Sequence, residues 1–227
     1  MNVTPSPSLA GRLRAATHDL HRVAEQSGIM RRLLRGEVGR PEYALLLRNF
    51  HALYHALETA LDRHANSPDL APLRMPALYR SAALAEDLRY FCGADWQSLT
   101  LSAAMSAYVA RIHEASGTRP ALLAAHAYVR YLGDLSGGQM LDGVIRRSFS
   151  LPTSEGAAFY AFGDAAQATT LKGQFRTALD RLPADAETAD AIAEEAKSAF
   201  ERHIALFREM DLLQQDAGQG SEPPPAA

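Results

Sequence analysis

One helical segment carries glycines and a carboxylate where a regular helix would tolerate them poorly. The run RYLGDLSGGQMLDGVIRR, residues 130–147, places Gly133, Gly137 and Gly138 close together. Each glycine costs a helix about 1 kcal/mol relative to alanine, so we expect a bend there. Gly133 and Gly137 share one helix face, leaving a strip without side chains where a flat ligand could reach the backbone. Asp134 borders this strip; a close helix–helix contact, or a helix end and restart, is the alternative.

A histidine near the start of the chain has surroundings that suit a metal ligand. His21 lies at the edge of an apolar helical stripe, beside small residues: Ala10, Thr17, Ala24 and Gly28. The imidazole would project from a depression, and a neutral imidazole in such a place can bind a metal. The alternative is a half-buried histidine with an ordinary hydrogen bond. Among the other histidines, His51 and His55 have zinc-like spacing, but the HExxH signature is absent.

Two cations share another helix face. Lys172 and Arg176 are four residues apart, with Phe175 alongside. Like charges at this spacing repel unless an anion lies between them. The carboxylates of a ligand would suit this pair, and a solvated basic face is the alternative.

Composition excludes several classes of function. The 227 residues are 47% hydrophobic and 22% charged, as in an ordinary soluble globular protein. The net charge of −3 gives a nucleic-acid partner no bulk support. Cys92 is the only cysteine, which excludes an intramolecular disulfide and an iron–sulfur cluster and fits a reducing cytoplasm. We find no signal-peptide core and no apolar run near the ~20 residues that span a bilayer, so we expect a cytoplasmic protein without membrane insertion.

The hydrophobic pattern is helical from one end to the other. Alanine and leucine dominate, and period-two alternation is not sustained, so we predict an all-α fold. Ser8 should cap the first helix, and Pro41 should lie in the first turn of a long helix ending before Asn66-Ser67-Pro68. Further helices are predicted near residues 76–91, 99–116, 119–148, 164–182 and 185–213.

Breakers and composition set the predicted boundaries. Gly93 and Gly117 are expected at C-terminal caps, and Leu151-Pro152-Thr153 should separate two helices. Without an internal repeat or a composition shift, residues 8–213 are predicted to form one domain. The polar, proline-rich residues 214–227 are predicted to be a disordered tail.

Three segments in order resemble the heme oxygenase family. TxxxHxxAE in Thr17–Glu25, followed by Met30, resembles its proximal helix, and YLGDLSGGQ in Tyr131–Gln139 resembles its distal-helix signature. LPTSEGAAFYAF, then Lys172 and Arg176, then EEAKSAFERHIALF follow its C-terminal half. The resemblance covers roughly residues 9–213. It implies a single-domain helical fold that holds heme b between a proximal helix and a glycine-kinked distal helix.

The resemblance implies a role for each matching residue. His21 would be the proximal iron ligand, and Glu25 would orient it. Gly133 and Gly137 would contact the heme face, and Asp134 would hold the distal water network. Around Asp134 the family places Arg130, Tyr131, Tyr54 and Glu58; the heme propionates would pair with Arg14, Tyr128, Lys172 and Arg176; and Phe200 and Phe207 would line the pocket.

The chain departs from the family's animal members at three positions. Val129 and His203 stand where those members carry threonine and asparagine, so the distal hydrogen-bond network is expected to differ. Arg14 replaces a lysine and keeps the charge. The hydrophobic membrane anchor is missing, as in the bacterial relatives.

The resemblance implies a heme-degrading monooxygenase for which heme is both cofactor and substrate. It would cleave heme with O2 to biliverdin, with the IXα isomer expected, carbon monoxide and ferrous iron, for iron recovery or bilin supply. The chain carries no flavin or nicotinamide fingerprint, so an external ferredoxin or flavoprotein reductase would supply electrons. A monomer is expected.

Two other functions stay open. A heme storage or delivery protein would also use His21 and the cations, although storage needs no distal water organised by Asp134. A thiaminase-like hydrolase would rely on Cys92, and nothing near Cys92 in the sequence suggests activation of the thiol.

Overall fold

The computed structural model describes residues 8–152 and 155–219, with side chains through residue 213, and most of these residues are helical. These ranges contain no strand, so the predicted all-α fold is confirmed. The α-helices are α1 (Leu9–Glu25), α2 (Gly28–Leu34), α3 (Arg40–Arg63), α4 (Ser81–Cys92), α5 (Ala103–Thr118), α6 (Leu123–Ala127), α7 (Gly133–Phe149), α8 (Ala165–Asp180) and α9 (Ala186–Gln219). A π-helical turn covers Tyr128–Leu132, and 3-10 turns lie at Ala71–Leu73, Pro76–Leu78, Trp96–Ser98, Pro120–Leu122 and Ala158–Tyr160.

The first helices begin and end where their residues dictate. The Ser8 hydroxyl accepts a hydrogen bond from the Gly11 backbone N–H at 3.3 Å, which confirms the predicted N-terminal cap of α1. Pro41 lies in the first turn of α3, where its missing N–H has no cost, and α3 ends at Arg63, before Asn66 as predicted.

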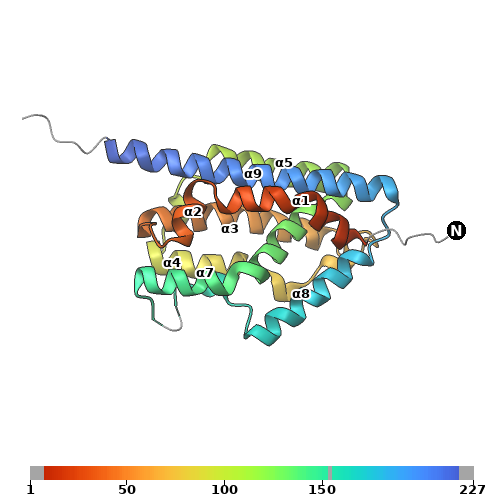
Figure 1. Ribbon diagram of the computed structural model, residues 1–227, viewed down its shortest axis with the longest axis horizontal. Helices are drawn as coiled ribbons and strands as arrows, with labels where there is room; N and C mark the ends of the chain where they lie inside the picture. Colours follow the sequence, from red (N-terminus) through yellow and green to blue (C-terminus); the bar gives the residue numbers. More distant parts are fainter. Residues whose placement is uncertain (1–7, 153–154, 220–227) are drawn as a thin grey trace, which may run out of the picture.

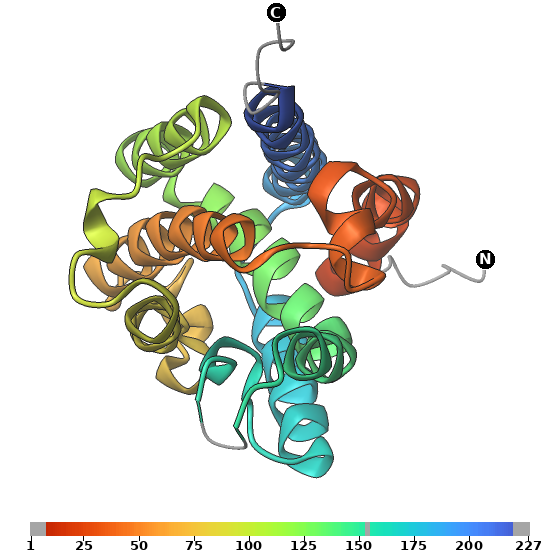
Figure 2. The ribbon, with the colours of Figure 1, turned by 90° about the vertical axis from the view of Figure 1, so that its left-hand side faces the viewer.

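Helices α4, α5, α6 and α9 pack against α3. α9 is the longest helix and runs beside α1 (Figure 1). α4 and α5 pack on different sides of α3 (Figure 2), so apolar residues on several faces of α3 are buried. Leu46, Leu53 and Leu57 are among its fully buried side chains and belong to the hydrophobic core.

The glycine-rich segment is interrupted where the sequence predicts a bend. The predicted helix over 119–148 is a chain of helical pieces: the 3-10 turn Pro120–Leu122, then α6, the π-helical turn and α7. The run changes direction before α7 (Figure 1). A π-helical turn widens the backbone locally and is common at functional sites. It directly precedes Gly133, so α7 starts at the glycine strip.

Several predicted boundaries shift. α4 and α5 begin at Ser81 and Ala103, later than predicted, because Pro76 opens a 3-10 turn and Ser102 caps α5 by accepting from the Met105 N–H at 3.0 Å. Gly93 is the C-cap of α4, with φ +76°, as predicted. The cap prediction for Gly117 is wrong, because α5 continues to Thr118 and only Arg119 leaves it.

Two predictions concern the regions that follow α7 and α9. Leu151 and Pro152 lie between α7 and α8 as predicted, and Thr153 lies outside the described residues. α9 continues to Gln219, six residues beyond the predicted helix end at residue 213. That residues 214–227 form a disordered tail stays a prediction. Residues 220–227 lie outside the described residues. Of the helices in the described part, none combines the length and apolarity needed to cross a bilayer.

Candidate functional site

A pocket opens between α1 and the start of α7, with α9 and α3 behind it. Its polar lining comprises His21, Glu25, Arg130, Asp134, Ser136, Tyr160 and His203. Its apolar lining comprises Ala24, Met30, Leu34, Phe50, Val129, Met140, Leu141, Phe159, Phe200 and Phe207. Gly133 and Gly137 complete the α7 wall. Apolar walls with a few polar groups are typical of a site for a large organic ligand.

His21 reaches this pocket from α1. Its side chain is 48% exposed, and its ring meets the Phe200 ring edge-on at 5.9 Å. Nδ1 lies 3.7 Å from Glu25 Oε1, too far for a hydrogen bond but close enough to favour the proton on Nδ1. The lone pair would then remain on Nε2, which is the state that binds a metal.

The small residues predicted to surround His21 differ in their positions and contacts. Only Ala24 lines the pocket; Thr17 is buried and donates to the Leu13 carbonyl at 2.8 Å. Gly28, at φ +42°, starts α2 against α9, and a Cβ there would lie 2.0 Å from the Phe207 carbonyl oxygen. The depression predicted from Ala10, Thr17 and Gly28 is therefore wrong, and the hollow beside His21 is the pocket between α1 and α7.

The glycine strip faces open space. Apart from its own helix, a Cβ on Gly133 or Gly137 would meet no atom within 4 Å. Both glycines line the pocket, so the strip is open to a ligand and is not a helix–helix contact. Gly138 lies on another side, where a Cβ would be 3.7 Å from the Tyr160 carbonyl oxygen. The strip therefore consists of two glycines, as their shared helix face predicts.

Asp134 belongs to a closed ring of hydrogen bonds with two of its predicted neighbours. Arg130 donates from Nη2 to Asp134 Oδ1 at 2.9 Å and from Nε to the Tyr54 hydroxyl at 2.9 Å. That hydroxyl donates to Asp134 Oδ2. Burial raises the pKa of Asp134 against the opposing attraction of Arg130, and the charge of Asp134 raises the pKa of Arg130 despite its burial. Tyr54 lies behind Asp134, outside the pocket lining.

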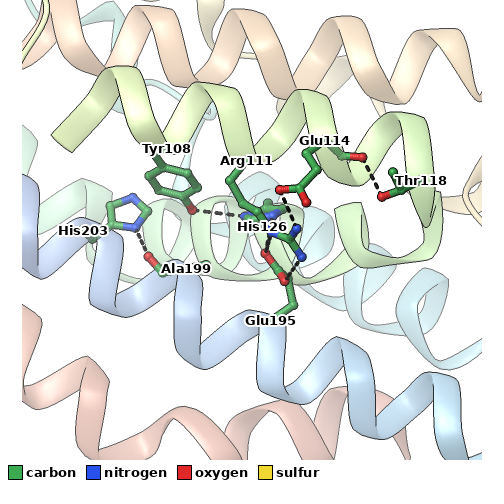
Figure 3. Close-up of polar contacts among 8 residues, drawn as sticks. All are labelled: Tyr108, Arg111, Glu114, Thr118, His126, Glu195, Ala199 and His203. Carbon is green, nitrogen blue, oxygen red and sulfur yellow. Dashed lines mark hydrogen bonds and ion pairs between the residues drawn. The ribbon is translucent and has the colours of Figure 1, made fainter. Parts of the chain in front are cut away.

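His203 is a third partner of Arg130, a contact the sequence did not predict. Its Nε2 lies 2.9 Å from Arg130 Nη1. Its Nδ1 lies 2.8 Å from the Ala199 carbonyl oxygen, a contact that Figure 3 shows. The ring is 2% exposed. The departure noted at this position thus changes the network around Asp134, while Val129 contributes only an apolar surface to the pocket.

Two residues predicted near Asp134 do not bond to it. Glu58 accepts from the Ser81 backbone N–H at 3.3 Å and from the Arg80 N–H, so it binds the start of α4. It lies one helical turn beyond Tyr54 on α3 and reaches a different neighbour. The Tyr131 hydroxyl is buried without a hydrogen-bond partner among the described residues, and its ring packs 5.7 Å from Phe175.

The predicted propionate partners gather between α1 and α8. Arg14 lies on α1, Lys172 and Arg176 lie one turn apart on α8, and these two helices contact each other; none of the three cations is part of the pocket lining. Burial lowers the pKa of Lys172, and the positive charges of Arg176 and Arg14 lower it further. In the described part of the chain, none of the three forms an ion pair. The Tyr128 hydroxyl lies 3.4 Å from Thr17 Oγ1, on the α1 side of this group.

Phe200 and Phe207 line the pocket as predicted. Most of the other apolar residues of the lining were not predicted from the sequence. Phe159 comes from the 3-10 turn before α8, within the matched stretch LPTSEGAAFYAF. Asp87 of α4 holds this turn by accepting from the Ala158 and Phe159 N–H groups, each at 2.8 Å. Only that stretch could have indicated this wall, because nothing local in the sequence links it to Asp87.

The competing sites find no support in the geometry. The rings of His51 and His55 stack at 5.9 Å, and no cluster of three possible metal ligands occurs among the described residues. Cys92 is half-buried, and burial raises the pKa of its thiol, the opposite of what an activated nucleophile needs.

Comparison with known proteins places the chain among enzymes of one kind. The family model described as "Heme oxygenase" matches residues 7–209. The chain is 39% identical to heme oxygenase 1 of Nostoc sp. over 91% of this chain and 87% of that protein. The crystal structure of heme oxygenase-2 from Synechocystis sp., in complex with heme and NO, matches with a TM-score of 0.89 at 37% identity, covering 93% of this chain and 88% of that one. Heme oxygenase-1 of the same cyanobacterium, in complex with heme, matches with a TM-score of 0.87 at 35% identity, covering 94% and 96%.

Proposed function

Because the chain belongs to the heme oxygenase family, the oxygen-dependent enzymes that degrade heme, we propose a role in that reaction for each side chain of the pocket. Heme is both the substrate and the prosthetic group, and the products are biliverdin, carbon monoxide and ferrous iron. One observation carries the assignment of roles: His21 lies on one wall of the pocket, and the open Gly133–Gly137 strip, bordered by buried Asp134, lies on another.

The pocket fits a flat ring with carboxylates at one edge. The space over the two glycines is open, and the remaining lining is largely apolar. Arg14 lies seven residues before His21 on α1, two turns along the same face and about 10 Å away. Arg14, Lys172 and Arg176 would therefore meet the propionates at one end of the pocket, with Tyr128 beside them. Charge-assisted pairs of this kind also fix the rotation of the ring.

His21 would bind the iron through Nε2. Glu25, on the Nδ1 side of the imidazole, would keep the proton there and strengthen Nε2 as a ligand. Phe200, packed edge-on against the imidazole, limits the rotation of the ring. When bound, heme supplies the iron that binds O2 and the ring carbon that is oxidised.

On the α7 wall, across the pocket from His21, Asp134 would take part in proton transfer. Its carboxylate is held at both oxygens, by Arg130 and by Tyr54, so it stays in one orientation at the pocket edge. Burial raises its pKa, so this carboxylate takes up a proton more readily than an exposed one would. Through an ordered water Asp134 would pass a proton toward the oxygen site. Gly133 and Gly137 would let the backbone approach closely and crowd that site toward one ring edge.

The electron source, the product isomer, the location and the assembly are also part of the proposal. We expect an external ferredoxin or flavoprotein reductase, because no flavin or nicotinamide fingerprint occurs in the sequence. The cations of α1 and α8, which would fix the rotation of the ring through its propionates, support a single product isomer, for which we propose IXα. The single cysteine supports a cytoplasmic location. We propose that residues 8–213 form one domain that acts as a monomer.

The test is single-turnover degradation of hemin under air with a reducing system. We expect stoichiometric hemin binding, then loss of the Soret band and release of biliverdin IXα, identified by chromatography. Stable hemin binding without bilin formation would instead indicate a storage or delivery protein, and failure to bind hemin would refute the roles assigned to the pocket.

A further inference from the structure

His203 makes two contacts that together determine where its proton lies. The Ala199 carbonyl oxygen can only accept a hydrogen bond, so Nδ1, at 2.8 Å, must donate to it. The Arg130 guanidinium can only donate, so Nε2, at 2.9 Å, must accept from Nη1. A neutral His203 with its proton on Nδ1 satisfies both contacts, and neither the other tautomer nor the imidazolium does.

The surroundings of His203 support this neutral form and hold the ring in place. The titratable groups that face it are Arg130 from the π-helical turn, Tyr108 from α5 and His126 from α6. Burial lowers the pKa of His203 well below its ordinary value, and the charge of Arg130 lowers it further. The Tyr108 ring packs edge-on against the imidazole at 5.1 Å (Figure 3).

Tyr108 is itself held by a buried polar group that leads away from the pocket. Its hydroxyl lies 3.3 Å from His126 Nδ1, and His126 Nε2 lies 3.1 Å from Glu195 Oε1. Arg111 donates to both oxygens of Glu195, at 2.9 and 2.6 Å (Figure 3). The wall behind His203 is therefore ordered up to the partly exposed Arg111.

Arg130 needs this third partner because it is 8% exposed. Nε donates to Tyr54 and Nη2 to Asp134, which leaves Nη1 to be satisfied. A buried N–H without an acceptor is costly, so without His203 the guanidinium would be held less firmly in its orientation toward Asp134.

We propose that His203 is a positioning residue: as a neutral hydrogen-bond acceptor it holds Arg130 in the orientation that pairs with Asp134 and Tyr54. The inference rests on the proposed role of Asp134 and extends it to His203, a residue of the pocket lining that would act through Arg130.

The first test needs no heme. Long-range 1H–15N correlation spectra of 15N-histidine-labelled protein distinguish the two imidazole tautomers and the imidazolium. We expect His203 to be neutral with its proton on Nδ1 across pH 6–8, and His203→Gln identifies its resonance. A proton on Nε2, or a charged ring at pH 7, would overturn the proposal.

The second test separates positioning from packing. His203→Leu removes the acceptor and keeps an apolar side chain, whereas His203→Gln keeps an acceptor near the position of Nε2. We expect His203→Leu to slow biliverdin formation about tenfold, which corresponds to about 1.4 kcal/mol, with the hemin spectrum and affinity unchanged. His203→Gln should recover most of this rate.

A control is His64→Gln, which alters a partly buried histidine that contacts Ser116 and lies outside the contacts of His203 and Arg130. It should keep a rate within twofold of wild type. A folded His203→Leu protein with the wild-type rate, or an equal loss in His64→Gln, would overturn the proposal. If wild type binds hemin without degrading it, the proposed function fails, and the tautomer measurement still tests the geometry.

Discussion

The α1 wall and the α7 wall of the pocket hold their polar groups under different conditions. On α1, the side chains of His21 and Glu25 are 48% and 53% exposed and lie 3.7 Å apart. On the other wall, Asp134 is 9% exposed and accepts a hydrogen bond at each carboxylate oxygen. A metal bond needs one lone pair on a ring of roughly correct orientation, whereas control of a proton needs fixed partners and little water.

The difference indicates which wall is held by the protein's own contacts. Arg130, Tyr54 and Asp134 close a ring of hydrogen bonds among themselves, and His203 extends it. Among the described residues, the His21 ring has one aromatic packing partner, the edge of Phe200, and bound iron would supply a further constraint. Substitutions on α1 should therefore alter ligation, and substitutions on the α7 side should alter chemistry while binding persists.

The largest effect is expected on the α1 wall, from His21→Ala. The partners that merely orient a metal ligand are worth about 10- to 100-fold, so loss of the ligand itself should slow turnover more than about 100-fold. The variant should still bind hemin through the apolar walls and the cations, without the histidine-ligated absorption spectrum. Added imidazole should partly restore both spectrum and rate.

The matched control for this prediction is His18→Ala, because His18 lies on the same helix with its side chain 68% exposed. It should match wild type in spectrum and rate. If His21→Ala matched wild type as well, another histidine would be the ligand.

On the α7 side, Asp134→Ala should leave hemin affinity within about threefold while biliverdin formation falls about 100-fold, the usual scale for a lost proton donor. Asp134→Asn, which keeps the shape but cannot carry the proton, should be similarly slow. Hemin titration and single-turnover kinetics measure the two quantities separately. Comparable losses of affinity and rate would make Asp134 a structural residue and would remove the contrast between the walls.

Gly137→Ala is expected to have two smaller effects of opposite sign, a gain in stability and a loss of hemin affinity. Nothing within 4 Å would meet the new methyl group, so the hemin-free protein should gain up to about 1 kcal/mol of helix stability. The same methyl group would occupy the space meant for the ring and lower hemin affinity about tenfold, as overpacking of a filled site does. Thermal unfolding and hemin titration measure the two effects.

Gly173→Ala supplies the control, because Gly173 is exposed within α8 and a Cβ there also meets open space. It should raise stability without changing hemin affinity. A Gly137→Ala protein with wild-type affinity would show that the strip does not contact the ligand.

The smallest effect on rate is expected from Lys172→Ala combined with Arg176→Ala. Both side chains are partly or fully exposed, so hemin affinity should fall only severalfold. The isomer pattern should change more, because the rotation of the nearly symmetric ring depends on its carboxylates. We expect a mixture containing β or δ biliverdin, resolved by chromatography. Pure α product would assign the choice of ring edge to crowding by α7.

The sequence predicted the parts of the site that lie within one helix. The shared face of Gly133 and Gly137 and the position of Asp134 beside them follow from helical periodicity, which is local. The membership of Arg130 and Tyr54 in the network came from the family resemblance, and the structure confirms it.

Contacts between helices were the part that periodicity could not predict. Glu58 was expected near Asp134 but binds the start of α4, because that choice depends on which helix packs beside α3. His203 was noted only as a departure, and its bond to Arg130 depends on the placement of α9 against the π-helical turn. The interruption was expected at the glycines, and the wider turn lies immediately before them.

The most direct test of the two-wall arrangement is a crystal structure of the protein with hemin. We predict iron bound to His21 Nε2, the backbone of Gly133 and Gly137 against the opposite face of the ring, and the propionates beside Arg14, Lys172 and Arg176. Iron bound to a different histidine, or a ring seated away from the glycine strip, would contradict the account.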